Sequence, residues 1–154
     1  MFFSEPSLDL EINQVDVITT FLNGDIDMEM YVEQPEGYNR GENLVCKLNK
    51  GLYSLKQSPR LWNHHINTYL IRIGFHHCIS DQCIYIKRDK NNELAIIGLW
   101  VNDIVIAASK CLMNETKNLL KKEFKITDQG SISYVLGILV KRDREKRCIY
   151  LNQQ

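Results

Sequence analysis

Residues 99–107 read "LWVNDIVIA", an Asn-Asp pair with apolar residues on both sides. The apolar character extends outward in both directions, over residues 94–101 (LAIIGLWV) and residues 104–109 (IVIAAS). Two such runs separated by a short polar pair are typical of two strands joined by a tight turn. We therefore predict a hairpin with Asn102 and Asp103 at its tip.

The flanking segments alternate between strand-like and helix-like patterns. Residues 15–21 (VDVITTF) are β-branched and partly alternating, which predicts a strand that carries Asp16. Ser58 and Pro59 supply an N-cap and a first-turn proline for a helix that runs at apolar helical spacing until Gly74. Further strands are predicted at residues 44–48, 83–88, 133–143 and 148–153, a turn at residues 89–92, and a second helix at about residues 113–124.

This order of elements predicts an α+β fold of the split βαβ type, an antiparallel sheet with helices on one face. In that plan the tip of the central hairpin lies beside the first strand. We therefore expect Asp16 to lie close to Asn102 and Asp103.

Length and composition indicate an ordinary globular chain. The 154 residues are 44% hydrophobic and 25% charged, as in soluble domains. No apolar run approaches the roughly 18 residues of a membrane span, and the N-terminus lacks the pattern of a secretory signal. The five cysteines are scattered and odd in number, which argues against a disulfide framework. We expect an intracellular protein, cytoplasmic or nuclear, without a membrane partner.

The formal charge is zero overall but unevenly distributed. Residues 1–42 hold ten acidic residues and one basic residue, and residues 43–154 hold nine acidic and eighteen basic residues. The two parts therefore carry charges of −9 and +9. A basic region of this kind can meet the phosphates of a nucleic acid, although many basic surfaces have no such partner.

Two groups of residues have side chains that suit a metal ion. Asp16 with Asp103 would suit divalent cations, which prefer oxygen ligands, although Asn and Asp are also common in exposed hairpin turns. The group at His76, His77 and Cys78, together with Cys83, has zinc-compatible side chains. Neighbouring residues point in different directions, however, and no second ligand pair follows at zinc-finger spacing, so we interpret this group as structural.

Five blocks follow one another along the chain: VDVITTFLNGDIDMEMYVEQPEGY, LVCKLNKGLYSLKQSPRLW, GFHHCISDQCIYIKR, LWVNDIVIAA and YVLGILVKRD. These blocks, in this order, give the chain a resemblance to the reverse transcriptases of copia-type retrotransposons. The resemblance implies a palm-type fold and a single partial reverse transcriptase domain over residues 1–154, with a palm core of about residues 11–141. It also implies Mg2+ or Mn2+ as cofactor, a template-primer of RNA or DNA and a dNTP as partners, and a surrounding Pol polyprotein.

The resemblance further assigns roles to individual residues. Asp16 and Asp103 match metal-binding aspartates, and with Asn102 they form the expected catalytic group. Phe21 matches an aromatic residue thought to exclude a ribose 2′-hydroxyl, and the alternative interpretation is a core aromatic. Residues of the block YSLKQSPR would contact the template and the incoming nucleotide, namely Tyr53, Lys56, Gln57 and Arg60.

The chain departs from the family pattern at several of these positions. Family members carry Y-V-D-D where this chain has Trp100-Val101-Asn102-Asp103, and an amide keeps the shape of a carboxylate but loses its charge. The usual Lys, Ala and Gly are replaced by Ile18, Thr20 and Ser54. We also expect the fingers segment to be largely missing.

From these departures we expect weakened or lost metal binding and a degenerate, inactive polymerase fragment. The alternative is a noncatalytic nucleic-acid-binding or interaction protein that reuses the palm fold.

Overall fold

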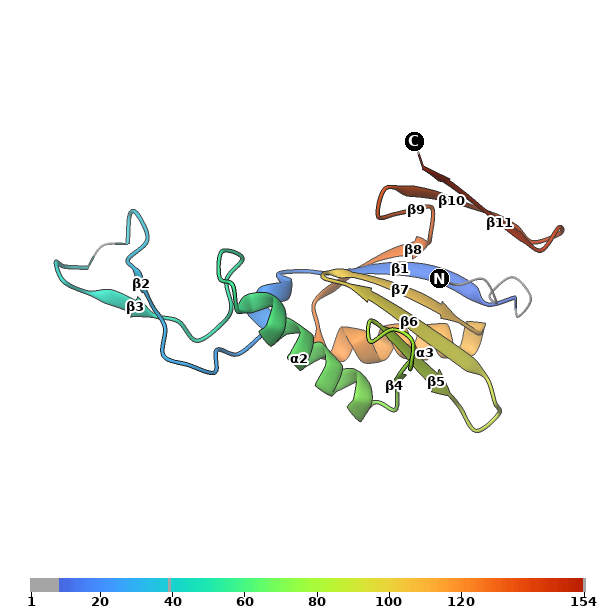
Figure 1. Cartoon of the computed structure of the whole chain (residues 1–154), viewed down its shortest axis with the longest axis horizontal. Coiled ribbons are helices and arrows are strands. Elements are labelled where there is room, and N and C mark those ends of the chain that lie inside the picture. Colours follow the sequence, from blue (N-terminus) through green and yellow to red (C-terminus); the bar gives the residue numbers. More distant parts are fainter. Residues whose placement is uncertain (1–8, 39, 154) are drawn as a thin grey trace. The chain divides into compact units, whose positions relative to one another are not determined.

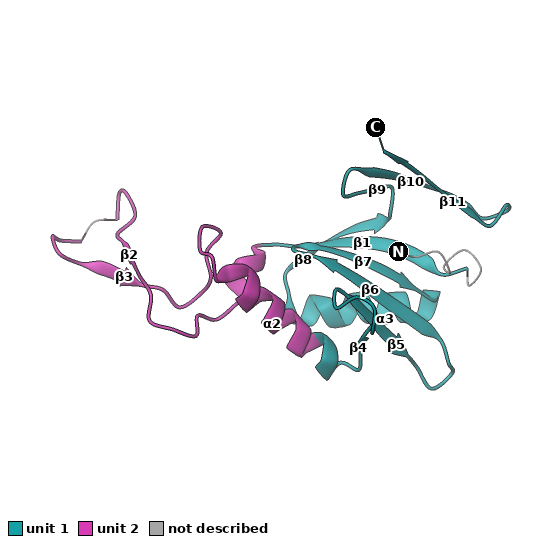
Figure 2. Ribbon diagram, in the orientation of Figure 1, with its two compact units in different colours: residues 1–18, 70–154 teal, residues 19–69 magenta. Residues whose placement is uncertain are grey.

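The computed structural model describes residues 9–38 and 40–153. The chain divides into two compact units (Figure 2), the first comprising residues 1–18 and 70–154 and the second residues 19–69. The boundary falls inside helix α2 (Ser58–Arg72), which runs from the second unit into the first. The single domain expected over residues 1–154 stays a prediction. In the described residues no helix is long and apolar enough to cross a bilayer.

The first unit contains a six-stranded antiparallel sheet with the order β4-β5-β6-β7-β1-β8 (Figure 1). Its strands are β1 (Glu11–Val17), β4 (His76–His77), β5 (Ile84–Arg88), β6 (Leu94–Trp100), β7 (Asp103–Ala108) and β8 (Ile126–Ser131). A separate three-stranded sheet consists of β9 (Tyr134–Val135), β10 (Ile138–Asp143) and β11 (Cys148–Gln153). The order β8-β1-β7-β6 within the larger sheet is the split βαβ arrangement. The chain is thus an α+β protein with a large antiparallel sheet, as predicted.

Helix α3 (Lys110–Glu123) packs against β6 and β7 on one face of this sheet (Figure 1). The side chain of Ser109 caps the helix by accepting a hydrogen bond from the N–H of Leu112. On the sheet, Val15 of β1 lies directly opposite Ile104 of β7, and both are fully buried. Directly opposed residues share a face of a sheet, so the α3 side holds the apolar core.

The other face of β1 and β7 is apolar at one end only. There Leu10, Ile12 and Ala107 form a buried cluster, and Ile132 and Ile149 pack against it. Because Ile149 belongs to β11, the three-stranded sheet contacts this end of the larger sheet. The opposite end of the same face carries the polar residues Gln14, Asp16 and Asp103.

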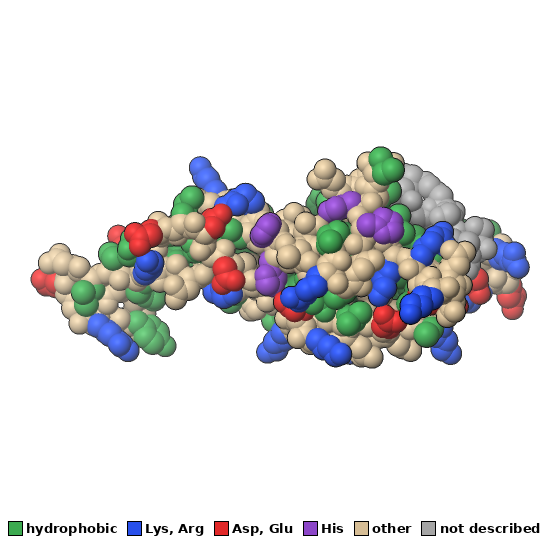
Figure 3. Space-filling view, turned by 90° about the horizontal axis from the view of Figure 1, so that it is seen from below, with side chains coloured by type: hydrophobic (Ala, Val, Ile, Leu, Met, Phe, Trp, Pro, Cys, Tyr) green, Lys and Arg blue, Asp and Glu red, His purple; other side chains and the backbone are tan. Residues whose placement is uncertain are grey.

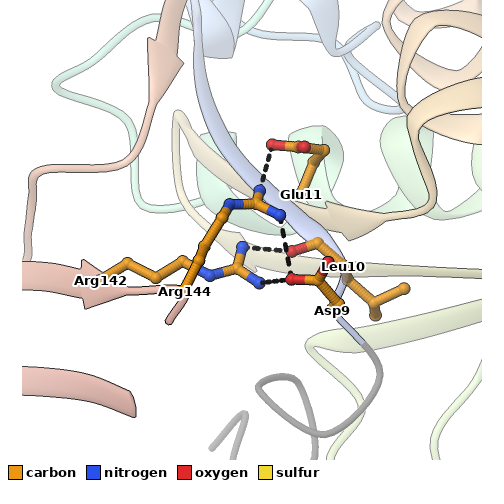
Figure 4. A network of polar contacts seen from close by, with 5 residues as sticks. All are labelled: Asp9, Leu10, Glu11, Arg142 and Arg144. Carbon is orange, nitrogen blue, oxygen red and sulfur yellow. Dashed lines mark hydrogen bonds and ion pairs between the residues drawn. The ribbon is translucent and has the colours of Figure 1, made fainter. Parts of the chain in front are cut away.

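Ion pairs join the same two sheets (Figure 4). Arg142 donates to the backbone carbonyl of Leu10 and pairs with Asp9 at 3.0 Å. Arg144 pairs with Asp9 at 2.9 Å and with Glu11 at 2.8 Å. The side chain of Arg142 is 18% exposed and that of Arg144 is 44% exposed. The two arginines therefore link the end of β10 to the start of β1. Arg142 does so from a largely buried position and Arg144 from a more exposed one.

On the α3 side, a buried lysine ties three elements together. Lys117 is 8% exposed and its Nζ lies 2.7 Å from Oδ1 of Asp128 in β8. Lys117 also donates to the amide oxygen of Asn13 in β1 at 2.6 Å, with that amide oriented so that its oxygen faces the ammonium. The β1–β8 register shifts at this place, leaving Gln129 as an extra residue, and Asp128 accepts the N–H of Gly130 at 3.0 Å. The lysine therefore secures a bulged edge strand.

The second unit contains the short helix η1 (Thr20–Asn23) and a hairpin of β2 (Tyr31–Glu33) with β3 (Val45–Lys47). Gly51 donates its N–H to the carbonyl of Gly24 at 2.9 Å, which brings two loop segments together. A Cβ on Gly51 would lie 2.8 Å from the carbonyl oxygen of Phe21, closer than real Cβ atoms come. The close approach of these backbones thus requires glycine at this position.

Three local predictions were wrong. The strand predicted to reach Phe21 ends at Val17, because Thr19 adopts a left-handed conformation (φ 53°) and η1 follows. Ser58 is not the N-cap of α2: its hydroxyl donates to the carbonyl of Leu52, and the carbonyl of Gln57 accepts the first helical bond. The strand predicted over residues 133–143 is broken between β9 and β10 by two residues of positive φ, Leu136 and Gly137.

Strand β8 (Ile126–Ser131) was not predicted at all, since its sequence ITDQGS lacks an alternating apolar pattern. The other predicted strands, the turn at residues 89–92 and both helices are confirmed to within a few residues.

The two arginines should respond differently to salt. We expect Arg144→Gln to lower the free energy of unfolding by less than about 1 kcal/mol, and the loss to vanish in concentrated NaCl, because exposed ion pairs are screened. Arg142→Gln removes a charged donor from a backbone carbonyl, so we expect a loss of about 1–3 kcal/mol that persists in salt. Urea unfolding of both variants at low and high NaCl measures this, and equal salt sensitivity would contradict it.

Asp128 should make the free energy of unfolding depend on pH. Burial by itself raises the pKa of this carboxyl, but hydrogen bonds from Lys117 and from the N–H of Gly130 outweigh it, and the pKa lies below the ordinary 3.8. A carboxyl with a lowered folded-state pKa stabilises the fold above its unfolded pKa, and this contribution is lost as the pH falls through the folded value. We expect Asp128→Asn to cost about 1–3 kcal/mol at pH 7.

The difference between Asp128→Asn and the parent protein should shrink as the pH falls below the ordinary 3.8 toward the lowered folded-state pKa, because the carboxyl of the parent protein becomes progressively protonated. Chemical unfolding between pH 3 and pH 7 tests this. Glu145→Gln removes the same charge from an exposed residue of the β10–β11 turn and serves as the control.

Candidate metal and nucleotide site

The hairpin predicted from the sequence is present, and its loop has two residues. Trp100 at the end of β6 pairs with Asp103 at the start of β7, which leaves Val101 and Asn102 between them. Val101 has a φ of 52° and the residue is 46% exposed. A β-branched residue rarely adopts a positive φ, because its Cβ and methyl groups crowd the backbone. The tip of the hairpin is therefore locally strained.

The tip lies beside the end of β1. The N–H of Val17 donates to the carbonyl of Asn102 at 2.9 Å, and Asp16 lies directly opposite Asp103 in the β1–β7 register. The side-chain amide of Asn102 donates to Oδ1 of Asp16. All three polar side chains are half-buried. The structure thus brings together Asp16, Asn102 and Asp103, as the sequence predicted.

A fourth residue, Gln14, belongs to the same group and was not predicted from the sequence. Its Nε2 lies 3.1 Å from Oδ1 of Asp103, and the residue is only 8% exposed. Gln14 precedes Asp16 by two positions in a strand, so both side chains project from the same face. That spacing was the signal available in the sequence.

The atoms of this group are of the kind that a hard divalent cation binds. Asp16 and Asp103 each have one carboxylate oxygen that accepts an amide hydrogen, and their other carboxylate oxygens make no hydrogen bond with the described residues. Carboxylate and amide oxygens are preferred ligands of Mg2+ and Mn2+. The described part of the chain has no cluster of three or more His, Cys, Asp or Glu side chains placed to hold a metal ion. The oxygen atoms of this group are thus of a type that fits a divalent cation, although the group contains two carboxylates rather than three.

The remaining predicted site residues lie in the second unit, and two of them are in contact. Phe21 of η1 and Tyr53 meet edge to face, with ring centroids 4.6 Å apart and an interplanar angle of 62°. Phe21 is 8% exposed and Tyr53 is 67% exposed. Phe21 is thus buried as a core aromatic would be, and Tyr53 is the ring that faces solvent.

Lys56, Gln57 and Arg60 surround the start of α2. The side chain of Lys56 is exposed, and Gln57 is half-buried. Arg60 pairs with Asp27 at 2.7 Å, and this hydrogen bond lowers the pKa of the Asp27 carboxyl. The guanidinium of Arg60 is therefore engaged with an acid of its own unit.

Charges that are segregated in the sequence are paired in the structure. Within the second unit, Lys50 pairs with Asp25 at 2.6 Å and Lys47 with Glu29 at 2.7 Å, in addition to Arg60 with Asp27. A hydrogen bond and the positive charge of Lys50 lower the pKa of Asp25. Figure 3 shows acidic and basic side chains interspersed on the face in view. The charge difference of the sequence therefore does not by itself indicate a nucleic-acid surface.

The sequence of the chain is similar to those of known proteins. The family model described as "Reverse transcriptase (RNA-dependent DNA polymerase)" matches residues 7–153. A retrovirus-related Pol polyprotein from transposon TNT 1-94 of Nicotiana tabacum is 40% identical over 96% of the chain. The corresponding polyprotein from transposon RE1 of Arabidopsis thaliana is 35% identical over 85% of the chain. A transposon Ty1 Gag-Pol polyprotein of Saccharomyces cerevisiae is 31% identical over 88% of the chain.

These relatives are much longer than the chain. It spans 11% of the tobacco protein and 9% of each of the other two.

The strained hairpin tip allows a test of the local geometry. We expect Val101→Gly to raise the free energy of unfolding by about 1 kcal/mol, because glycine adopts positive φ without steric cost. Val101→Ala keeps a Cβ in the same conformation and should recover less of this energy. Thermal unfolding of the three proteins measures the difference, and a less stable glycine variant would contradict the strained geometry.

Proposed function

The chain belongs to the reverse transcriptase (RNA-dependent DNA polymerase) family, and on this premise we propose that it is a palm-type part of a copia-type reverse transcriptase with an impaired metal site. In this proposal Asp16 and Asp103 are the metal ligands, and Asn102 replaces a third carboxylate. The partners would be a template-primer and a dNTP, within a Pol polyprotein. The degenerate site leaves the chain with little or no nucleotidyl transfer of its own.

The observation that carries the proposal is the register of β1 with β7. Asp16 and Asp103 are 87 positions apart in the sequence, yet they lie directly opposite each other. Like charges at directly opposed positions of a sheet destabilise it, so this placement of two carboxylates favours a site that binds a cation. A bound cation would offset this repulsion.

Mg2+ or Mn2+ in such a site supplies positive charge that stabilises the transferring phosphoryl group and activates the attacking hydroxyl. The contribution of this chain is to hold oxygen ligands in place on two paired strands. The formal charge of Asp16 and Asp103 together is −2, and an aspartate in place of Asn102 would make it −3. The amide of Asn102 also donates to Asp16, so it occupies a carboxylate oxygen instead of adding another. Both effects weaken cation binding.

We extend the proposal to the second unit by similarity to the family. Phe21, Tyr53, Lys56, Gln57 and Arg60 would contact the incoming nucleotide and the template. Phe21 is buried against Tyr53, so a ribose that reaches Phe21 would also meet the tyrosine ring. To bind a phosphate, Arg60 would have to release Asp27. The carboxylate and the phosphate are both anionic groups that a guanidinium binds.

Asn102→Asp should raise the affinity for Mg2+ and Mn2+ by about tenfold or more, since affinity for hard cations grows with the number of anionic ligands. Titration calorimetry with each metal alone measures the change. Asn118→Asp, which adds the same charge at an exposed position of α3, is the matched control and should leave the affinity unchanged.

Asp16→Asn tests the other side of the same site and should abolish the binding. Equal affinities in the parent protein, Asn102→Asp and Asp16→Asn would show that these residues do not bind a cation. A primer-extension assay with Mn2+ on the parent and Asn102→Asp proteins then tests catalysis. RNA binding that weakens with salt, without incorporation in either protein, would favour the noncatalytic alternative.

A further inference from the structure

Gln14 is a buried polar side chain whose amide points at the candidate metal site. It lies on β1 with its amide nitrogen 3.1 Å from Oδ1 of Asp103 on β7, and it is 8% exposed. A buried amide is costly unless it is hydrogen-bonded, and this one is bonded to a carboxylate. The bond therefore constrains both side chains.

The contact of Gln14 is one half of a reciprocal arrangement. Gln14 reaches from β1 to the carboxylate of the β6–β7 hairpin, and Asn102 reaches from that hairpin to Asp16 on β1. Each carboxylate thus receives one amide N–H. Bonds from amides to ionised carboxylates are stronger than neutral ones, and here they offset part of the repulsion of the opposed acids.

The two amides differ in their relation to a cation. Asn102 occupies the position that a third carboxylate holds in the related enzymes, whereas Gln14 lies two residues before Asp16 along the strand. With Oδ1 of Asp103 held by Gln14, Oδ2 is the oxygen that makes no hydrogen bond with the described residues. Outer partners of this kind orient the ligands of metal sites.

We propose that Gln14 is a positioning residue, which orients the carboxylate of Asp103 so that Oδ2 faces a divalent cation. This inference rests on the proposed function, because it assigns Gln14 a role toward the same site. It adds a residue that the predicted catalytic group does not contain.

Gln14→Met keeps the length and unbranched shape of the side chain and removes the amide. We expect it to lower the affinity for Mn2+ about tenfold, as the loss of an outer-shell partner typically does. Calorimetry with Mn2+ alone is carried out on the parent protein and in the Asn102→Asp background. Gln129→Met makes the same change at an exposed position of β8, and it should leave the affinity unchanged. Thermal unfolding in EDTA reports separately on the fold.

A second variant guards against a failure to fold. Gln14→Asn retains an amide on a side chain that is shorter by one methylene, too short to keep the 3.1 Å contact, and should lose affinity as Gln14→Met does. Unchanged or higher Mn2+ affinity in these variants would overturn the role of Gln14, even if they melt at a lower temperature. If Asp16→Asn also leaves Mn2+ binding unchanged in both backgrounds, the metal site itself is refuted and the role of Gln14 with it.

Discussion

The pairing of β1 between β7 and β8 is the constraint on which the first unit depends. Side chains of a strand alternate between faces, so this register sends Val15 and Val17 into the core under α3 and Gln14 and Asp16 to the other face. A slip by one residue would exchange the two sets and bury a carboxylate in the apolar core. The core and the candidate site are therefore two consequences of one register.

Polar contacts hold this register on both faces of the sheet. On the α3 side, Lys117 joins Asn13 to Asp128 at the bulge of β8. On the other side, amide-carboxylate bonds join β1 to the β6–β7 hairpin, through Gln14 and Asn102. Hydrophobic burial is not directional, whereas these bonds specify which residues lie opposite one another. The alignment of Asp16 with Asp103 thus depends on polar groups that bury little apolar surface.

Ion pairs between residues far apart in the sequence explain why acidic and basic residues are unevenly distributed along the chain. The acidic N-terminal residues meet basic partners from later in the sequence, as Asp25 meets Lys50 and Asp9 meets Arg142 and Arg144. Exposed pairs of this kind contribute little stability individually. The pair at Arg142 differs, because the same guanidinium also satisfies a backbone carbonyl next to the apolar cluster under β11.

The sequence by itself determined the central hairpin and both helices, because hydrophobic period and turn residues are local signals. The order of these elements, which is that of the split βαβ plan, also predicted that Asp16 lies near Asn102 and Asp103. Tertiary structure alone decided strand β8, whose residues ITDQGS have no strand period and are held by Lys117 and by pairing with β1. It also decided where β1 ends, since the N–H of Ile18 bonds to the carbonyl of Lys125 and Thr19 turns the chain away. The role inferred for Gln14 likewise depends on tertiary structure, because its partner Asp103 is 89 positions away and is brought near only by the register of two strands.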